Sequence, residues 1–223
     1  MVAQYLLSHT STFGLLGVGL IGLGMLLSAL VYRGRQGERY SPLNHFISEL
    51  GERGVARLAW AFNDGLMLGG LCLLPFMLGM GLALRSPLGW LAGAAGVFTA
   101  LACSAVGFFP MNDLKTHFPA AMAYFRGGLA AVTLFSLAIL AQTGTQPAIP
   151  KTAALAGGLA ALSYALFLVN LGEFSKKDAP AEHSLEARFT SDRPRVWKTA
   201  VLEWLVFFAT MAWFALMAGI GIG

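Results

Sequence analysis

Long apolar runs separated by short polar connections are the dominant pattern of this chain. Each run has about the 20 residues that a helix needs to cross the hydrocarbon core of a bilayer. The predicted spans are residues 12–32, 58–84, 88–109, 119–141, 152–171 and 199–221. The pattern therefore predicts an all-α, polytopic membrane protein. We expect a six-transmembrane-helix bundle that forms a single domain over residues 1–223.

Composition supports a membrane protein and excludes an ordinary soluble domain. Of the 223 residues, 57% are hydrophobic and only 12% are charged, whereas soluble domains contain about 25% charged residues. The mean hydropathy is +0.67. The two cysteines, Cys72 and Cys103, lie inside apolar runs, where we interpret them as small hydrophobic residues rather than as a disulfide or a redox pair.

The connections between the spans are alternately rich and poor in Lys and Arg, and this alternation predicts the orientation of the chain in the membrane. The second and fourth connections contain only Arg85 and Lys151. The first, third and fifth contain Arg33, Arg35, Arg39, Arg53, Arg57, Lys115, Lys176, Lys177, Arg188, Arg193, Arg195 and Lys198. By the positive-inside rule these three connections face the cytoplasm, so both termini lie outside the cell (inner) membrane. The net charge of +4 reports this topology and does not indicate a nucleic-acid partner.

The segment 41–51, between the first two spans, has the signals of a short amphipathic helix. Ser41 can cap it, Pro42 suits its first position and Gly51 can end it after about three turns. Leu43, Phe46, Ile47 and Leu50 share one face, and His45, Ser48, Glu49 and Glu52 share the other. We expect a cytoplasmic interfacial helix that lies flat on the membrane and carries a polar site. The alternative is that it only anchors a loop.

Polar residues within the spans fall in one layer near the cytoplasmic side. At about 1.5 Å per residue, Asp64, Arg126 and Glu203 lie roughly 9, 10 and 6 Å from the cytoplasmic ends of their predicted spans. We expect Arg126 to pair with Asp64 or Glu203, which leaves the other acid to pair with a histidine, bind a cation or hold a proton. A purely structural ion pair, or an Arg126 side chain that extends to the headgroups, are the alternatives. The sequence therefore predicts an inner-leaflet polar pocket.

Two carboxylate and imidazole pairs have helical spacing in the cytoplasmic connections. His45 and Glu49, and Asp113 and His117, are each four residues apart. The acid either orients the imidazole or shares a divalent metal such as zinc with it. The metal hypothesis has His45, Glu49, Asp113 and His117 as ligands, although the chain has neither an H-E-x-x-H motif nor a paired-cysteine motif.

The chain resembles the prokaryotic membrane family labelled domain of unknown function 998, which is loosely grouped with Frag1/DRAM/Sfk1 proteins. The resemblance covers nearly the whole chain and rests on Tyr40-Ser41-Pro42-Leu43-Asn44-His45-Phe46-Ile47-Ser48-Glu49-Leu50-Gly51, Gly107-Phe108-Phe109-Pro110 and His117. It implies a six-helix bundle but no established activity and no catalytic residues. Ser41-x-x-x-His45 also resembles the first motif of zinc-dependent alkaline ceramidases. Those proteins have seven spans and two histidines in the last, and the last span here has none.

Three hypotheses about function follow. In the first, the pocket binds a lipid headgroup or small amphiphile, and membrane lipids are the partners. Its expected lining residues are His45, Glu49, Asp64, Asp113, His117, Arg126 and Glu203. The second is a metal-dependent hydrolase that acts on lipid. The third is an accessory subunit or homo-oligomer in which Gly65-x-x-x-Gly69 and Gly89-x-x-x-Gly93 bind other spans.

Overall fold

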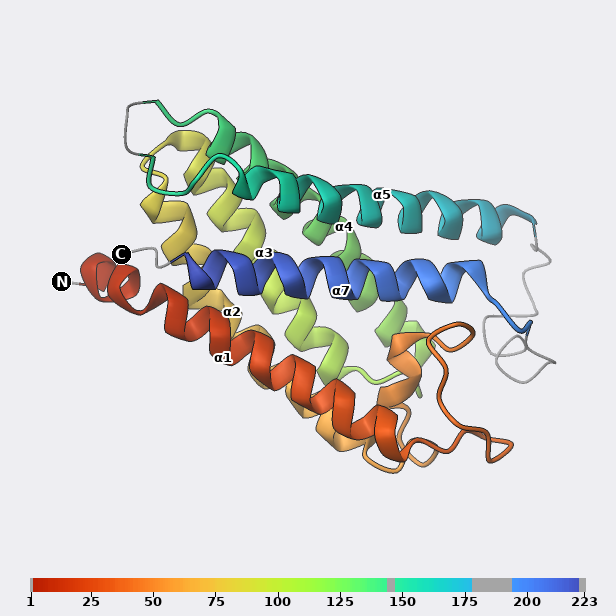
Figure 1. The fold of residues 1–223 in the computed structure, drawn as a ribbon. Helices are drawn as coiled ribbons and strands as arrows, with labels where there is room; N and C mark the ends of the chain where they lie inside the picture. The colour runs from red at the N-terminus through yellow and green to blue at the C-terminus, as the bar shows by residue number, and fades with distance from the viewer. Residues whose placement is uncertain (1, 144–146, 178–193, 221–223) are drawn as a thin grey trace.

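The structure is a computed structural model that describes residues 2–143, 147–177 and 194–220. Within these residues it contains helices and no strands, and it confirms the all-α fold class (Figure 1). The long helices are α1 (Val2–Val31), α2 (Ala59–Ala83), α3 (Pro87–Phe108), α4 (Leu114–Leu140), α5 (Ala153–Lys177) and α7 (Lys198–Gly219). A short 3-10 helix, η1 (Ile47–Gly51), lies between α1 and α2. All six long helices are long and apolar enough to cross a membrane.

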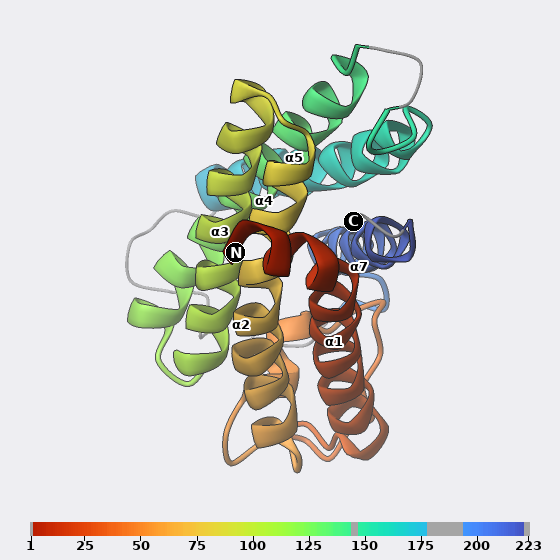
Figure 2. The same ribbon diagram turned by 90° about the vertical axis from the view of Figure 1, so that its left-hand side faces the viewer.

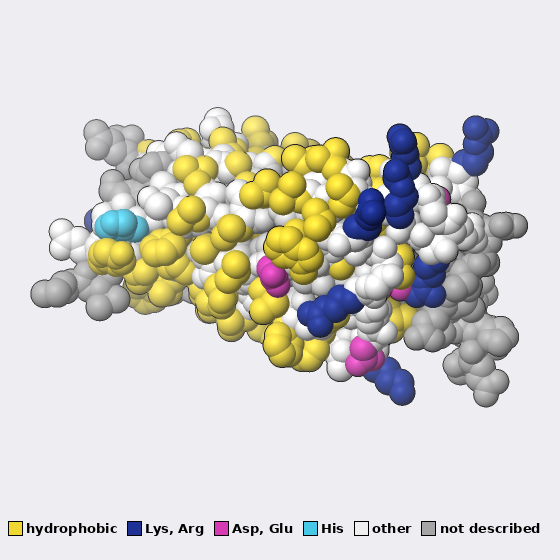
Figure 3. Space-filling view, turned by 90° about the horizontal axis from the view of Figure 1, so that it is seen from below, with side chains coloured by type: hydrophobic (Ala, Val, Ile, Leu, Met, Phe, Trp, Pro, Cys, Tyr) yellow, Lys and Arg dark blue, Asp and Glu magenta, His cyan; other side chains and the backbone are white. Residues whose placement is uncertain are grey.

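Each long helix packs against its neighbours in sequence, and the last helix closes the bundle. α7 packs against both α5 and α1 and lies between them in Figures 1 and 2. The start of α1 and the end of α7 lie at the same end of the bundle (Figure 1). The connections from α1 to α2 and from α3 to α4 lie at the other end, toward which Lys and Arg side chains gather in Figure 3. Hydrophobic side chains cover the middle of that view.

Two helices begin earlier than the apolar pattern predicted. α1 begins at Val2 rather than near residue 12, and α4 begins at Leu114 rather than at Pro119. The Asp113 carboxylate caps α4 by accepting the Lys115 N–H at 3.0 Å, so Pro119 lies inside the helix and not at its first position. A proline suits the first turn, but the cap decides where the helix starts.

Glycines allow the close approach of α1 and α2. A Cβ added to Gly65 would lie 2.8 Å from the Leu20 carbonyl oxygen, and one added to Gly69 would lie 2.9 Å from that of Gly17. These distances are below any normal contact, so the two backbones pack together only because the side chains are absent. Gly65-x-x-x-Gly69 therefore packs inside the bundle.

The second glycine pair is used in the same way. A Cβ on Gly89 would lie 3.0 Å from the Gly81 carbonyl oxygen of α2, and one on Gly93 would lie 3.2 Å from the Gly81 Cα. The glycine faces that motivated the accessory-subunit hypothesis are thus occupied by the chain's own helices.

Candidate functional site

The connection between α1 and α2 does not form the predicted interfacial α-helix. Turns precede η1, which is a 3-10 helix of five residues. Its expected polar face is buried, since His45 and Glu49 are only 2% and 1% exposed, whereas Leu43 of the expected apolar face is 53% exposed. The Glu49 carboxylate accepts the Phe46 N–H at 2.8 Å, and such side-chain bonds compete with the α-helical ladder. The segment is packed into the bundle rather than laid on its surface.

Polar side chains of α1 and α2 bond to the backbone of this buried segment. Ser28 Oγ donates to the Leu50 carbonyl oxygen at 2.8 Å, and Asn63 Nδ2 donates to that of Gly51 at 2.9 Å. Non-helical backbone at membrane depth is tolerated only where protein or water satisfies its polar groups. Ser28 and Asn63 meet that requirement for the end of η1.

Helix α7 holds the beginning of the same segment. Glu203 Oε2 accepts the Ile47 N–H at 2.8 Å, and Trp204 Nε1 lies 3.2 Å from the His45 carbonyl oxygen and 3.0 Å from the Tyr40 hydroxyl. Burial, with a further contribution from the nearby carboxylate of Glu203, raises the pKa of Tyr40 above its usual range. The Tyr40 phenol therefore keeps its proton. We name the backbone from His45 to Gly51, with the side chains that bond to it, the anchored segment.

His45 lies beneath the connection and faces a carboxylate. Its Nε2 is 3.6 Å from Glu38 Oε1, and its Nδ1 lies against the backbone of Ser41. Burial opposes ionisation of Glu38, but hydrogen bonds from backbone N–H groups, including that of Gln36, and the His45 imidazole outweigh it and lower the pKa of Glu38. A second contact in the connection is the ion pair of Arg35 with Glu52. Both pairs fix the loop that leads into and out of η1.

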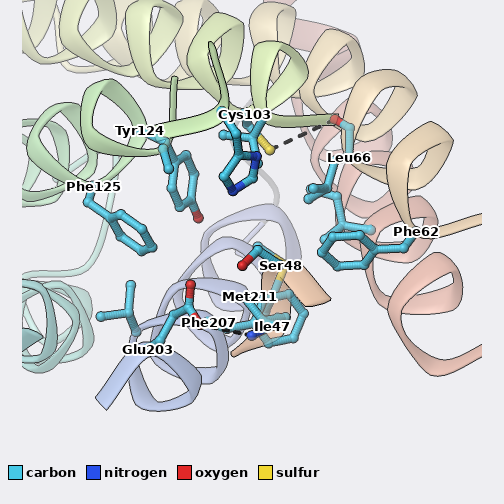
Figure 4. Close-up of a pocket in the computed structure, with 15 residues that line it drawn as sticks. Ile47, Ser48, Phe62, Leu66, Cys103, Tyr124, Phe125, Glu203, Phe207 and Met211 are labelled. Carbon is cyan, nitrogen blue, oxygen red and sulfur yellow. Dashed lines mark hydrogen bonds between the residues drawn. The ribbon is translucent and has the colours of Figure 1, made fainter. Parts of the chain in front are cut away.

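Two adjoining cavities of about 60 Å³ each lie beside the anchored segment. The first is central and is lined by residues of α1, η1, α2, α3, α4 and α7; the second lies toward α5. They share the lining residues Ser48, His117, Ala121, Phe125 and Glu203. Figure 4 shows the Ser48 and Tyr124 hydroxyls and the Glu203 carboxyl turned toward the middle of the first cavity. Apolar side chains form most of the walls.

Two of the polar lining residues are nearly inaccessible from outside. His117 and Glu203 are each 6% exposed. His117 Nδ1 lies 2.7 Å from the Phe109 carbonyl oxygen, which turns the ring so that it lines both cavities. Glu203 uses one oxygen for the Ile47 N–H. Each residue is thus positioned by a backbone bond and keeps a second polar atom.

The seven residues predicted for the pocket are divided among three places. Glu203 and His117 line the cavities, and His45 and Glu49 belong to the buried connection. Asp64, Asp113 and Arg126 are exposed.

The expected pairing of Arg126 with Asp64 or Glu203 is not formed. Among the described residues the structure shows no ion pair of Arg126; Arg35 pairs with Glu52, and the His45 imidazole contacts Glu38. Asp113 bonds the start of its own helix, at Lys115 and Thr116, and does not orient His117. Depth along a helix was predicted from residue counts, but the side on which each residue lies was not.

A metal site is not assembled from the predicted ligands. Throughout the described ranges, no three His, Cys, Asp or Glu side chains come close enough together to hold a metal ion. His45 and His117 are separately bonded to the backbone of Ser41 and Phe109. The mixed nitrogen and oxygen ligand set therefore has no structural support.

Several residues of the cavities and the anchored segment were not among the predicted site residues. They are Ser28, Tyr40, Asn63, Tyr124 and Trp204. Asn63 and Trp204 directly adjoin the predicted site residues Asp64 and Glu203 in the chain, so two neighbouring residues with polar atoms inside an apolar run were the available signal. Ser28 and Tyr124 had no comparable signal.

Taken together, the fold and the anchored segment define a polytopic α-helical membrane protein with two small, mostly apolar cavities, lined by a few polar side chains, in one half of its bundle. The sequence matches DUF998, described as a protein of unknown function, over residues 20–220. The chain therefore belongs to this family, as its resemblance to the family predicted. No curated protein and no solved structure matches the chain.

Proposed function

We propose that this protein binds the polar end of a small amphiphile in its paired cavities. One observation carries the proposal: two buried polar side chains, Glu203 and His117, line both cavities, whose walls are mostly apolar. Buried polar groups within a membrane bundle are costly and usually serve a pocket, pathway or partner. An amphiphile supplies both the polar contacts and the apolar contacts that such walls require.

The second cavity offers a route for the apolar tail. Its lining includes Phe118, which is 40% exposed, together with Met122 of α4 and Leu171 of α5. A headgroup beside Glu203 would thus leave its tail between α4 and α5, in contact with lipid. The metal-dependent hydrolase and the accessory subunit lack a comparable supporting observation, so amphiphile binding is preferred.

Filling the shared wall tests this proposal. Ala121 lines both cavities, whereas Ala130 is exposed on the same helix. We expect Ala121→Phe to remove co-purifying lipid or amphiphile and Ala130→Phe to retain it, as measured by native mass spectrometry after purification in a mild detergent. Thermal unfolding of both variants, and a smaller Ala121→Val change, separate loss of ligand from loss of fold. Absence of bound amphiphile from the wild-type protein, or equal occupancy in Ala121→Phe, would contradict the proposal.

We further infer that the site lies in the cytoplasmic leaflet of the cell membrane, with both termini outside. The support is the collection of basic residues in the connections at the end of the bundle that contains η1. A reporter that is active only outside the cytoplasm, fused after the last residue, should be active, and the same reporter inserted near Gly37 should be inactive. The reverse pattern would overturn this orientation.

A further inference from the structure

The polar atoms in the cavities that have no hydrogen-bond partner among the described residues indicate the chemistry of the headgroup. Glu203 accepts the Ile47 N–H through Oε2. Its other oxygen has no partner among the described residues. In its ionised form this carboxyl can only accept. A cationic donor that enters the cavity favours that form, so the second oxygen is matched by a charged donor.

His117 adds a second acceptor. A carbonyl oxygen cannot donate, so the 2.7 Å contact between Nδ1 and the Phe109 carbonyl oxygen places the ring proton on Nδ1. The neutral imidazole then presents the lone pair of Nε2. No described residue donates to this nitrogen. The Phe109 carbonyl therefore fixes the tautomer in which His117 Nε2 can only accept a hydrogen bond from the ligand.

The Ser48 and Tyr124 hydroxyls also line the first cavity, and both can accept a hydrogen bond from a ligand. Ser48 directs its proton to the Met111 sulfur at 3.5 Å, which leaves oxygen lone pairs turned toward the cavity. Tyr124 can both donate and accept. Neither cavity has a Lys or Arg side chain among its described lining residues, so no fixed cation is present to receive an anionic group.

We propose that the cavities recognise the primary ammonium of a single-chain or lipid amphiphile, and that they discriminate against heads whose terminal group is a phosphate or another anion. This inference rests on the amphiphile-binding function proposed above and specifies its ligand class. An ammonium has three donors and no acceptor, which matches the Glu203 oxygen, the His117 Nε2 and a hydroxyl lone pair. A phosphate would face the same groups with acceptors only, and the Glu203 carboxylate would repel it.

A series of probes with one alkyl chain tests the inference directly. Dodecylamine, dodecyltrimethylammonium and dodecyl phosphate would be added at equal mole fraction to the wild-type protein in a neutral detergent, and binding followed by calorimetry. We expect dodecylamine to bind at least about tenfold more tightly than either competitor, because charge-assisted hydrogen bonds are the strong ones. The trimethylammonium probe keeps the charge but lacks N–H donors. Equal or tighter binding of dodecyl phosphate or dodecyltrimethylammonium would overturn the inference.

Two lysolipids with the same acyl chain separate the sources of the ammonium. Lysophosphatidylethanolamine has a primary ammonium, and lysophosphatidylcholine has the methylated group. If lysophosphatidylethanolamine binds more tightly than lysophosphatidylcholine, and at least as tightly as dodecylamine, the site is assigned to a phospholipid head. Binding of dodecylamine alone assigns it to a single-chain amine. In either case the ammonium is the recognised group.

Variants tie the preference to the proposed residues. Glu203→Gln retains an acceptor for the Ile47 N–H and should weaken dodecylamine binding about tenfold or more, whereas Glu38→Gln removes a carboxylate outside the cavity lining and should leave it unchanged. His117→Phe should also weaken it. Unchanged dodecylamine affinity in Glu203→Gln would contradict the inference but leave amphiphile binding intact. If no probe binds the wild-type protein, the proposed function itself fails.

Discussion

Among single glycine-to-alanine variants on α1, Gly24→Ala is expected to be the least stable. A Cβ at this position would overlap the backbone carbonyl of Ala61 in α2, and a backbone, unlike the end of a flexible side chain, cannot move aside cheaply. Overpacking of this kind costs about 1 to 3 kcal/mol. The measurement is thermal unfolding of the purified protein in detergent, where Gly24→Ala should unfold at a clearly lower temperature than the wild type.

Gly22→Ala is the matched control. It adds the same atom two residues away on the same helix, where nothing lies within 4 Å of the new Cβ. Alanine favours a helix over glycine by up to about 1 kcal/mol, so this variant should be as stable as the wild type or slightly more stable. Equal destabilisation of Gly22→Ala and Gly24→Ala would show that the α1 and α2 contact is not as described.

Asn63→Leu is expected to release the anchored segment. Leucine has a similar size but cannot donate to the Gly51 carbonyl oxygen, which would be left buried and unpaired. Such a loss costs about 1 to 3 kcal/mol. We expect a lower unfolding temperature and faster proteolytic cleavage in the connection between α1 and α2.

Asn112→Leu provides the comparison for this result. Asn112 also bonds the backbone of that connection, since its Nδ2 donates to the Arg53 carbonyl oxygen at 2.8 Å, but Asn112 is exposed. Water can replace an exposed bond, so this variant should change stability by about 0.5 kcal/mol or less. A larger effect from Asn112→Leu than from Asn63→Leu would refute the view that burial makes the Gly51 bond important.

The helices were predictable because the length of an apolar run is a one-dimensional property. A span needs a minimum number of apolar residues whatever it packs against. The side of the helix on which each polar residue lies cannot be predicted in this way, as Asn63 and Asp64 illustrate. They are neighbours at the same depth, yet Asn63 is buried against η1 and Asp64 is exposed. Successive helical residues point about 100° apart, and only the packing of α2 against the rest of the bundle decides which of them faces inward.

The candidate site was predicted in part for the same reason. Glu203 was identified because acids are rare within apolar spans, and His117 because it follows Asp113 at helical spacing. Both prove to line the cavities. Arg126 satisfied the same criterion as Glu203 and lies outside. The segment 41–51 was misread because its apolar spacing fits an α-helix, whereas its backbone is held by Ser28, Asn63 and Glu203 from three separate helices. Such long-range partners leave no local pattern.

The dependence of the anchored segment on α7 has a consequence for biogenesis. The ribosome releases α1 and the segment early, but the side chains of Glu203 and Trp204 that bond to Ile47 and His45 are synthesised last. Until α7 enters the membrane, these backbone groups must be satisfied by water at the membrane surface. The site is therefore completed only when the final helix inserts, and a nascent chain arrested before α7 contains every earlier helix without a finished cavity.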